Sequence, residues 1–172
     1  IKLMDKYRPN EIYNLAASRQ DFEPGESAEY MTNITGLMAL RVLDAVRLLE
    51  LGGHTRICQA STSEIYGNVK EVPQTEKTPI YPCSLYAVSK VYAYWTTVNY
   101  RSLHDLFTCN AILFDHEAPI LGEYGVPRKI SKGVAQIALG LQTKLLLGNL
   151  NAKRDWGHAN DYARMMWMML QA

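Results

Sequence analysis

The feature that most constrains this chain is a regular alternation of short apolar runs with longer amphipathic segments. Four apolar runs predict strands: "EIYNLAA" (residues 11–17), "TRICQAS" (55–61), "FTCNAILF" (107–114) and "KLLLG" (144–148). Apolar residues recur at helical spacing over residues 1–7, 27–51, 82–104, 128–140 and 158–172. Strands that alternate with helices indicate right-handed crossovers and a parallel sheet with helices on both faces. The sequence therefore predicts an α/β fold.

Small and polar residues follow three of the predicted strands: "LAAS" (15–18), "ASTSE" (60–64) and "DHEAP" (115–119). In open parallel sheets, ligands bind beyond the carboxyl ends of the strands. We therefore expect these three clusters to converge on one edge of the sheet and to form the ligand site there.

Composition argues against several classes of binding partner and cellular compartment. The 172 residues carry a formal net charge of +1, which gives no reason to expect nucleic acid or an anionic membrane surface as a partner. No apolar run approaches the roughly 20 residues of a membrane-spanning helix, and charges interrupt the first residues, unlike a signal peptide. The chain has three cysteines, Cys58, Cys83 and Cys109. The odd number and the lack of a CxxC pattern argue against a disulfide framework or a metal site. A reduced, cytoplasmic compartment fits best.

Two short clusters can carry acid/base chemistry. Tyr86 and Lys90 are four residues apart, so a helix places them on one face, where the ammonium lowers the pKa of the phenol. Thr62 and Glu64 alternate after a strand and point the same way if the segment is extended. A hydroxyl, a carboxylate and an activated phenol make a general acid/base site. Two simpler interpretations stay open: a solvated helix face for the Tyr–Lys pair, and a helix-capping acid for Glu64.

Longer segments of the chain resemble one known family. "QASTSEIYG", "TPIYPCSLYAVSKVYAYW", "RKIS" and "LGNLNAKRDWGHANDY" resemble the GDP-mannose 4,6-dehydratases, which are extended short-chain dehydrogenase/reductases. The resemblance implies a partial Rossmann-like sheet that lacks the N-terminal Gly-rich βαβ unit and the C-terminal part of the substrate domain. It places residues 1–115 in the NADP-binding domain and residues 116–172 at the start of the nucleotide-sugar region. The chain then corresponds to an interior portion of about half an enzyme.

The resemblance also implies a reaction: conversion of GDP-mannose to GDP-4-keto-6-deoxymannose with tightly bound NADP, in a homo-oligomer. In that family pattern, Tyr86, helped by Lys90, takes the proton of the sugar 4-hydroxyl, and Thr62 holds that hydroxyl. Glu64 removes the C5 proton and assists the loss of the 6-hydroxyl as water.

The resemblance also implies binding roles for residues that match the family's motifs. The resemblance assigns cofactor contacts, beside Tyr86 and Lys90, to Leu15, Ala16, Ala17, Ser18, Tyr30 and His116. It assigns the GDP portion of the substrate to Arg128, Lys129 and Arg154, cations of the kind that a diphosphate binds. Other interpretations are a helix-face aromatic for Tyr30, an ordinary loop histidine for His116 and solvated side chains for the three basic residues.

The chain departs from the family pattern in its binding segments. It has "DHEAPILG" where the family has "NHESPRRG", so Asp115 replaces an Asn, and Ile120 and Leu121 replace two arginines. Pro127 replaces a Thr, and "AASRQ" replaces "AAQSH". Two functions are consistent with these changes: a dehydratase, or a divergent or truncated relative that acts as a non-catalytic assembly subunit. An epimerase or reductase fits less well, because neither needs Glu64 as an elimination base.

Overall fold

A computed structural model describes residues 1–18, 27–122 and 125–172 of the chain. These residues form two compact units. The first unit comprises Ile1–Leu113 together with Arg164–Ala172, and the second comprises Phe114–Ala163. The assignment of residues 1–115 to cofactor binding and of residues 116–172 to substrate binding stays a prediction.

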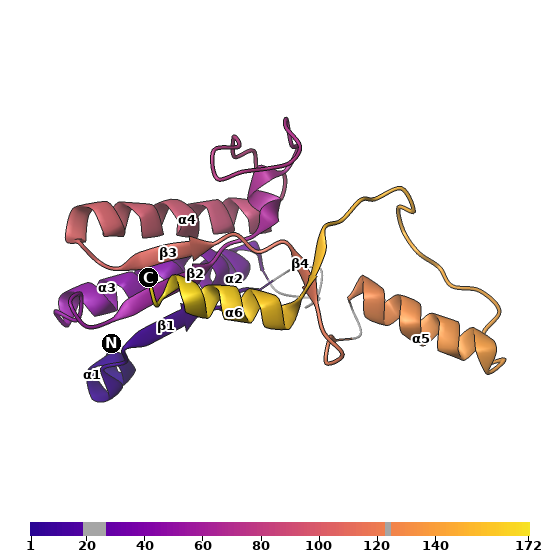
Figure 1. Cartoon of the computed structure of the whole chain (residues 1–172), viewed down its shortest axis with the longest axis horizontal. Coiled ribbons are helices and arrows are strands. Elements are labelled where there is room, and N and C mark those ends of the chain that lie inside the picture. Colours follow the sequence, from indigo (N-terminus) through magenta and orange to yellow (C-terminus); the bar gives the residue numbers. More distant parts are fainter. Residues whose placement is uncertain (19–26, 123–124) are drawn as a thin grey trace. The chain divides into compact units, whose positions relative to one another are not determined.

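The first unit is built on a three-stranded parallel sheet with the strand order β1-β2-β3 (Figure 1). Its strands are β1 (Glu11–Asn14), β2 (Arg56–Ala60) and β3 (Thr108–Ala111). Both neighbouring pairs are parallel, and each pairs four residues in register. The α/β fold and three of the four predicted strands are therefore confirmed.

Helices alternate with these strands along the chain, as the periodicity predicted. They are α1 (Lys2–Tyr7), a helical run from α2 (Ala28–Thr32) through the π-helical η1 (Asn33–Leu37) to α3 (Met38–Leu48), then α4 (Leu85–His104) and α6 (Ala159–Met169). The predicted helices at 1–7, 27–51, 82–104 and 158–172 are confirmed with slightly shorter bounds. Within the described ranges, no helix combines the length and the apolar character needed to cross a bilayer.

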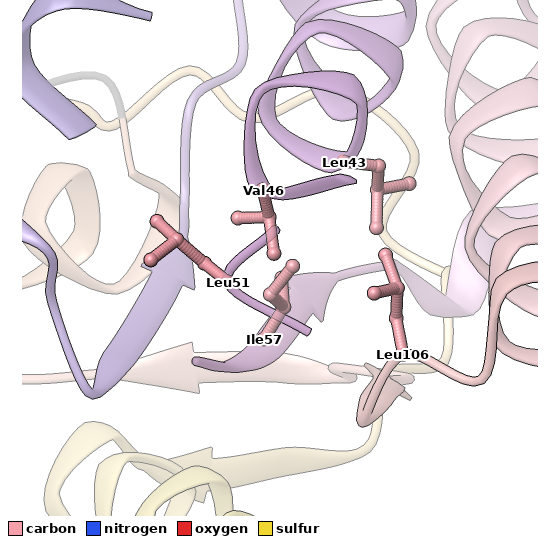
Figure 2. Packing of buried hydrophobic residues seen from close by; sticks show 5 residues of the cluster. All are labelled: Leu43, Val46, Leu51, Ile57 and Leu106. Atoms are coloured by element: carbon pink, nitrogen blue, oxygen red, sulfur yellow. The ribbon is translucent and has the colours of Figure 1, made fainter. Parts of the chain in front are cut away.

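One apolar cluster attaches α3 to the sheet. Leu43 and Val46 of α3 meet Ile57 of β2, and Leu51 and Leu106 complete the cluster (Figure 2). All five side chains are buried. Full burial of one such side chain contributes roughly 1.5–3 kcal/mol, so this cluster holds α3 firmly against one face of β2.

Helix α4 covers the same face. Thr108 Oγ1 donates to the Thr97 carbonyl at 3.1 Å, and Asn110 Nδ2 donates to the Tyr94 carbonyl at 3.2 Å. Thr108 is paired in register with Ile57, so α3 and α4 contact the same side of the sheet. These bonds fix the axial position of α4 relative to β3.

The opposite face of the sheet is covered by the end of α6. Met166 and Leu170 pack on Cys58 of β2 and Ala111 of β3 in a second buried cluster. Adjacent strand residues point to opposite faces, and Ile57 and Cys58 accordingly belong to different clusters. The first unit is thus a three-layer α/β/α structure, with helices on both faces as predicted.

The second unit holds a parallel pair of short strands, β4 (Asp115–Glu117) and β5 (Trp156–His158), and the helix α5 (Val126–Ala138). The predicted helix at 128–140 is confirmed, beginning two residues earlier. The predicted strand at residues 144–148 is wrong, because this run has no strand partner and Leu145 instead packs on Gly133 of α5. The pattern did not predict β4 and β5, because three residues are too few to show alternation.

A glycine sets the loop beside the second predicted cluster. The 3₁₀ turn η2 (Ser63–Tyr66) ends at Gly67, which has φ 49° and ψ −115°. A Cβ at this position would lie 1.8 Å from the Tyr81 carbonyl oxygen. Tyr81 in turn donates its amide to the Ile65 carbonyl at 2.9 Å. Gly67 therefore lets the loop return directly against η2.

We expect Gly67→Ala to lower the free energy of unfolding by at least about 2 kcal/mol, because the new Cβ meets backbone and the positive φ adds strain. Urea unfolding followed by tryptophan fluorescence measures the change. Gly53→Ala is the matched control, since a Cβ there would meet no heavy atom within 4 Å, and its effect should stay within about 0.5 kcal/mol. Equal effects of the two substitutions would contradict the proposed role of Gly67.

Candidate active site

A buried polar network lies at the carboxyl end of the sheet in the first unit. Asn14 Nδ2 donates to Gln59 Oε1 at 2.6 Å, which links the ends of β1 and β2. Gln59 Nε2 donates to the Ala60 carbonyl at 3.0 Å, and Lys90 Nζ donates to the same oxygen at 2.8 Å. One backbone carbonyl at the end of β2 therefore fixes the position of a lysine from α4.

Lys90 is charged and almost fully buried. Its exposed fraction is only 2%, and desolvation lowers its pKa from 10.5 to about 8. Its Nζ lies 5.8 Å from the centre of the Tyr86 ring, one turn earlier on α4. The structure thus brings the predicted Tyr–Lys pair together on one helix face. An ammonium has three N–H donors, and the bond to Ala60 uses one of them.

The second predicted cluster follows β2 directly, but the extended conformation expected for it is wrong, because Ser63–Tyr66 form the 3₁₀ turn η2. Thr62 is the N-cap of η2, and its Oγ1 accepts from the Glu64 amide at 3.3 Å. The Glu64 carboxylate lies near the start of α4, where Ser84 Oγ is 3.5 Å from Oε2, at the outer limit of a hydrogen bond. Ser84 is the N-cap of α4 and accepts from the Ala87 amide at 3.1 Å. The helix that carries Tyr86 and Lys90 therefore also borders Glu64.

Ser84 was not predicted as a site residue, although its sequence position carries a signal. Ser is a favoured N-cap residue, and here it directly precedes the first helical position, Leu85. The helix predicted from residue 82 starts only at Leu85, so the periodicity concealed the cap. The contribution of Asn14 and Gln59 was not predicted either, because no spacing rule pairs side chains 45 residues apart.

One buried hydroxyl beside this network has no partner. Ser61 Oγ is 4% exposed and forms no hydrogen bond within the part of the chain that the structure describes. Ser61 stands between Ala60 and Thr62, where β2 ends. Buried polar atoms almost always have a partner, so this hydroxyl marks a place where a ligand atom or a water completes the site.

The loop after β1 contains four of the predicted cofactor positions, residues 15–18. The Ala16 amide donates to Asn14 Oδ1 at 3.3 Å. Thr35 Oγ1 of η1 both accepts from the Ser18 amide at 3.0 Å and donates to the Ser18 carbonyl at 3.1 Å. The π-helical turn therefore holds the end of this loop, and the loop is tied to the same network as Lys90 through Asn14.

Tyr30 lies on α2, and its side chain is 49% exposed. Its amide donates to Ser27 Oγ, the N-cap of this helix, at 3.0 Å. The ring is therefore available to a ligand, but this position also suits an ordinary helix-face aromatic. Residues 19 and 20, which complete the departure "AASRQ", lie outside the described residues.

The predicted positions in the second unit are His116, Arg128, Lys129 and Arg154. His116 Nδ1 contacts the Phe114 carbonyl at 2.8 Å, and its ring stacks on Tyr162 with a centroid distance of 4.8 Å. A carbonyl only accepts, so Nδ1 carries a proton in this contact. Arg128 and Lys129 are exposed in the first turn of α5.

Asp115 has a partner that the sequence did not reveal. Its Oδ2 lies 3.5 Å from Arg154 Nε, and both side chains are about half exposed. Arg154 is a predicted diphosphate contact, and Asp115 is one of the departures from the family pattern. Asp115 therefore lies beside the guanidinium that the substrate is predicted to use, and its carboxylate can compete for it.

The other departures differ in consequence. Pro127 is in the first turn of α5, where the backbone amides have no intrahelical acceptor, so the missing N–H costs the helix nothing. Ile120 is 94% exposed, whereas Leu121 lies so close to Gly125 that a Cβ there would be 2.3 Å from Leu121 Cδ2. Leu121 therefore has a local packing role that an arginine would not fill in the same way.

Comparisons with known proteins agree with the resemblance. A family model described as GDP-mannose 4,6 dehydratase matches residues 1–172. GDP-mannose 4,6-dehydratase from Yersinia enterocolitica is 54% identical over 171 residues, and the human protein is 50% identical over 171 residues. Each match covers 99% of this chain and 46% of the relative. The chain thus spans about half the length of the curated relatives it matches.

A solved structure supports the fold alone. RMD from Pseudomonas aeruginosa complexed with NADPH superposes with a TM-score of 0.83, covering 94% of this chain and 56% of that chain. The two sequences are 22% identical. The arrangement of helices and strands is therefore shared.

We expect the burial of Lys90 to make stability rise with pH. The pKa of Lys90 is about 8 in the folded chain and 10.5 in the unfolded chain, so between these pH values the unfolded chain binds more protons. Proton binding favours the unfolded chain at low pH, and this effect disappears as the pH rises. The free energy of unfolding should therefore increase by about 3 kcal/mol between pH 7 and 11 relative to Lys90→Met. Urea unfolding at a series of pH values measures the difference. Lys77→Met, at an exposed lysine, should give a curve parallel to that of the unmodified chain, and a parallel curve for Lys90→Met would contradict the account.

Proposed function

We propose that this chain, which belongs to the GDP-mannose 4,6-dehydratase family, carries the acid/base half of a lyase site that converts GDP-mannose to GDP-4-keto-6-deoxymannose. The observation that carries this proposal is the grouping of Lys90, Tyr86 and Glu64 around the carboxyl end of β2. Ligands of parallel sheets bind at such ends.

Tyr86 is the proposed base for the sugar 4-hydroxyl. A phenol gives up its proton more readily when a positive charge lies close to it. With a pKa of about 8, Lys90 keeps that charge at neutral pH, and the Ala60 carbonyl prevents it from turning away. Tyr86 takes the hydroxyl proton while Thr62 holds the same hydroxyl by a hydrogen bond.

Glu64 is the proposed base for the elimination. A ketone at C4 makes the neighbouring C5 proton acidic, and the Glu64 carboxylate accepts that proton. The electron pair of the C5–H bond forms the C5–C6 double bond as the C6–O bond breaks. The leaving hydroxide takes a proton from Glu64 and departs as water. The Ser84 hydroxyl near Oε2 orients the carboxylate for both transfers.

Nicotinamide dinucleotide chemistry is needed to make the ketone at C4 and to reduce C6, and such a cofactor supplies it when bound. The residues present fit this group. Ser61 Oγ offers a buried polar atom without a partner, and Lys90 has N–H donors beyond the bond to Ala60. Residues 15–18 are mostly small, so a ligand can approach their backbone, and Tyr30 and His116 are the further contacts we propose. By resemblance we propose NADP.

Arg128, Lys129 and Arg154 are the proposed contacts of the GDP diphosphate. All three are cationic and exposed. Arg154 must exchange Asp115 for the diphosphate, which carries more negative charge than one carboxylate. We therefore propose that Asp115 weakens substrate binding without preventing it.

The second candidate function is a non-catalytic assembly subunit, and one surface favours self-association. Leu40, Tyr92, Trp95 and Tyr100 of α3 and α4 line a groove of about 520 Å³, and Trp95 is 56% exposed. Two copies joined through this face would bury the exposed rings in a bundle of four helices. We propose that the complete protein is a homo-oligomer that pairs here, which is compatible with catalysis.

We also propose a cytoplasmic location. All three cysteines are free, and Cys83 is exposed. Free exposed thiols persist in a reducing compartment.

We expect a chimera to distinguish the two candidate functions. In it, residues 1–172 replace the matching segment of the Yersinia enterocolitica relative, which is 54% identical there. The chimera should form the 6-deoxy product from GDP-mannose, and Glu64→Gln should lower kcat by about 100-fold or more. Glu76→Gln, at an exposed acid, is the control and should leave kcat unchanged.

A folded chimera without product would favour the assembly subunit. If Glu64→Gln instead kept most of its rate, the site would be that of a reductase or epimerase, which needs no elimination base. Circular dichroism of each variant confirms that a lost rate does not reflect unfolding.

We expect Asp115→Asn in the same chimera to tighten the binding of GDP by about 3- to 10-fold, because Arg154 no longer has a competing carboxylate. Isothermal titration calorimetry measures the dissociation constant, and the gain should shrink at high salt. Asp161→Asn removes an exposed acid of the same unit and should leave the constant unchanged. An unchanged or weaker affinity for Asp115→Asn would exclude competition for Arg154.

A further inference from the structure

Two cysteines face each other across neighbouring strands of the first unit. Cys58 of β2 and Cys109 of β3 are paired in register in the parallel ladder. Paired residues of neighbouring strands are about 4.8 Å apart and project to the same face. Disulfides form between Cα atoms roughly 4.4–6.8 Å apart. The backbone of the sheet therefore already holds these two residues at a distance that a disulfide bridges.

The two thiols share one environment but differ in access. Both pack beneath α6, where Cys58 is fully buried among Met166 and Leu170, while Cys109 is partly exposed. A hydrogen bond from the Cys58 thiol lowers the pKa of Cys109, with a further contribution from the charge of Arg101. The same hydrogen bond and burial raise the pKa of Cys58. Cys109 is accordingly the nucleophile of the pair, since the thiolate is the reactive form.

We propose that Cys58 and Cys109 are a peroxide-sensitive pair that closes to a cross-strand disulfide. The Cys109 thiolate attacks one oxygen of hydrogen peroxide, the O–O bond breaks, and the released hydroxide takes a proton and becomes water. The Cys58 sulfur then attacks the sulfenic acid of Cys109, the S–O bond breaks, and the second oxygen leaves with the Cys58 proton as water. The two sulfurs lose two electrons, and one peroxide is reduced to two waters.

Cys83 provides an internal contrast. It is the exposed cysteine of the chain, and its Sγ lies 3.4 Å from the Tyr81 carbonyl rather than beside another thiol. Exposure alone would make Cys83 the most readily oxidised cysteine. Proximity to a second thiol instead directs the disulfide to the pair on the sheet. If exposure decides the outcome, peroxide oxidises Cys83; if proximity decides it, peroxide joins Cys58 and Cys109 in a disulfide.

Peptide mapping separates these products. The 172-residue chain is treated with hydrogen peroxide, its remaining thiols are alkylated after denaturation, and it is digested with trypsin without reduction. The three cysteines fall on separate peptides, residues 57–70, 78–90 and 102–128. We expect peptides 57–70 and 102–128 to appear joined, two mass units lighter than their sum, and to separate after reduction. The same product should form in Cys83→Ser, which lacks the exposed thiol.

Cys58→Ala tests the order of the two steps, with Cys83→Ser as its background. Without a resolving thiol, Cys109 should accumulate as the sulfenic acid, trapped by dimedone, and then as the sulfinic acid. Independent alkylation of residues 58 and 109 after peroxide treatment of the folded chain would overturn the proposal. So would a disulfide that involves Cys83. These two contradicting outcomes, independent alkylation and a disulfide of Cys83, are measured on the unsubstituted chain. A poorly folded Cys58→Ala variant therefore does not weaken the test.

Discussion

The site depends on one buried hydrogen bond, from the Lys90 ammonium to the Ala60 carbonyl. Lys90 lies between a helix and the sheet and is only 2% exposed, so its charge loses most of its hydration at a cost in free energy. The lowered pKa of Lys90 reflects that desolvation cost. The carbonyl offsets part of it, and Asn14 and Gln59 keep the carbonyl in place through the ends of β1 and β2. These contacts hold the Lys90 ammonium at the carboxyl end of β2.

The second constraint is that one helix carries or borders all the residues of the proposed acid/base chemistry. Lys90 and Tyr86 lie on its first two turns, and its N-cap, Ser84, reaches the Glu64 carboxylate. The proposed base for the hydroxyl and the proposed base for the carbon acid are therefore positioned by the same element. A shift of α4 would disturb both, and two hydrogen bonds from side chains of β3 to its carbonyls further along oppose such a shift. Gly67 completes the arrangement by folding the intervening loop back onto η2.

Much of this could be predicted from the sequence, because periodicity reports which faces are buried. It located the three strands of the main sheet, every long helix and the shared face of Tyr86 and Lys90. It failed for residues 144–148, where Leu145 packs on α5 and no strand forms, and for β4 and β5, which are too short to show a period. It also gave no sign of contacts between distant residues, such as Asn14 with Gln59 or Asp115 with Arg154. Those contacts depend on the register of strands, which no local pattern encodes.

In the proposed reaction, Glu64 removes a carbon-bound proton that is later replaced from water. The direct measurement is to convert GDP-mannose in D₂O with the chimera that contains residues 1–172, and to locate deuterium in the product by NMR. The account predicts one deuterium at C5 of the 6-deoxy sugar, since the carboxylate exchanges its proton with solvent before C5 is protonated again. A 6-deoxy product without deuterium at C5 would contradict it, because no solvent-exchanged base would then have acted at that carbon.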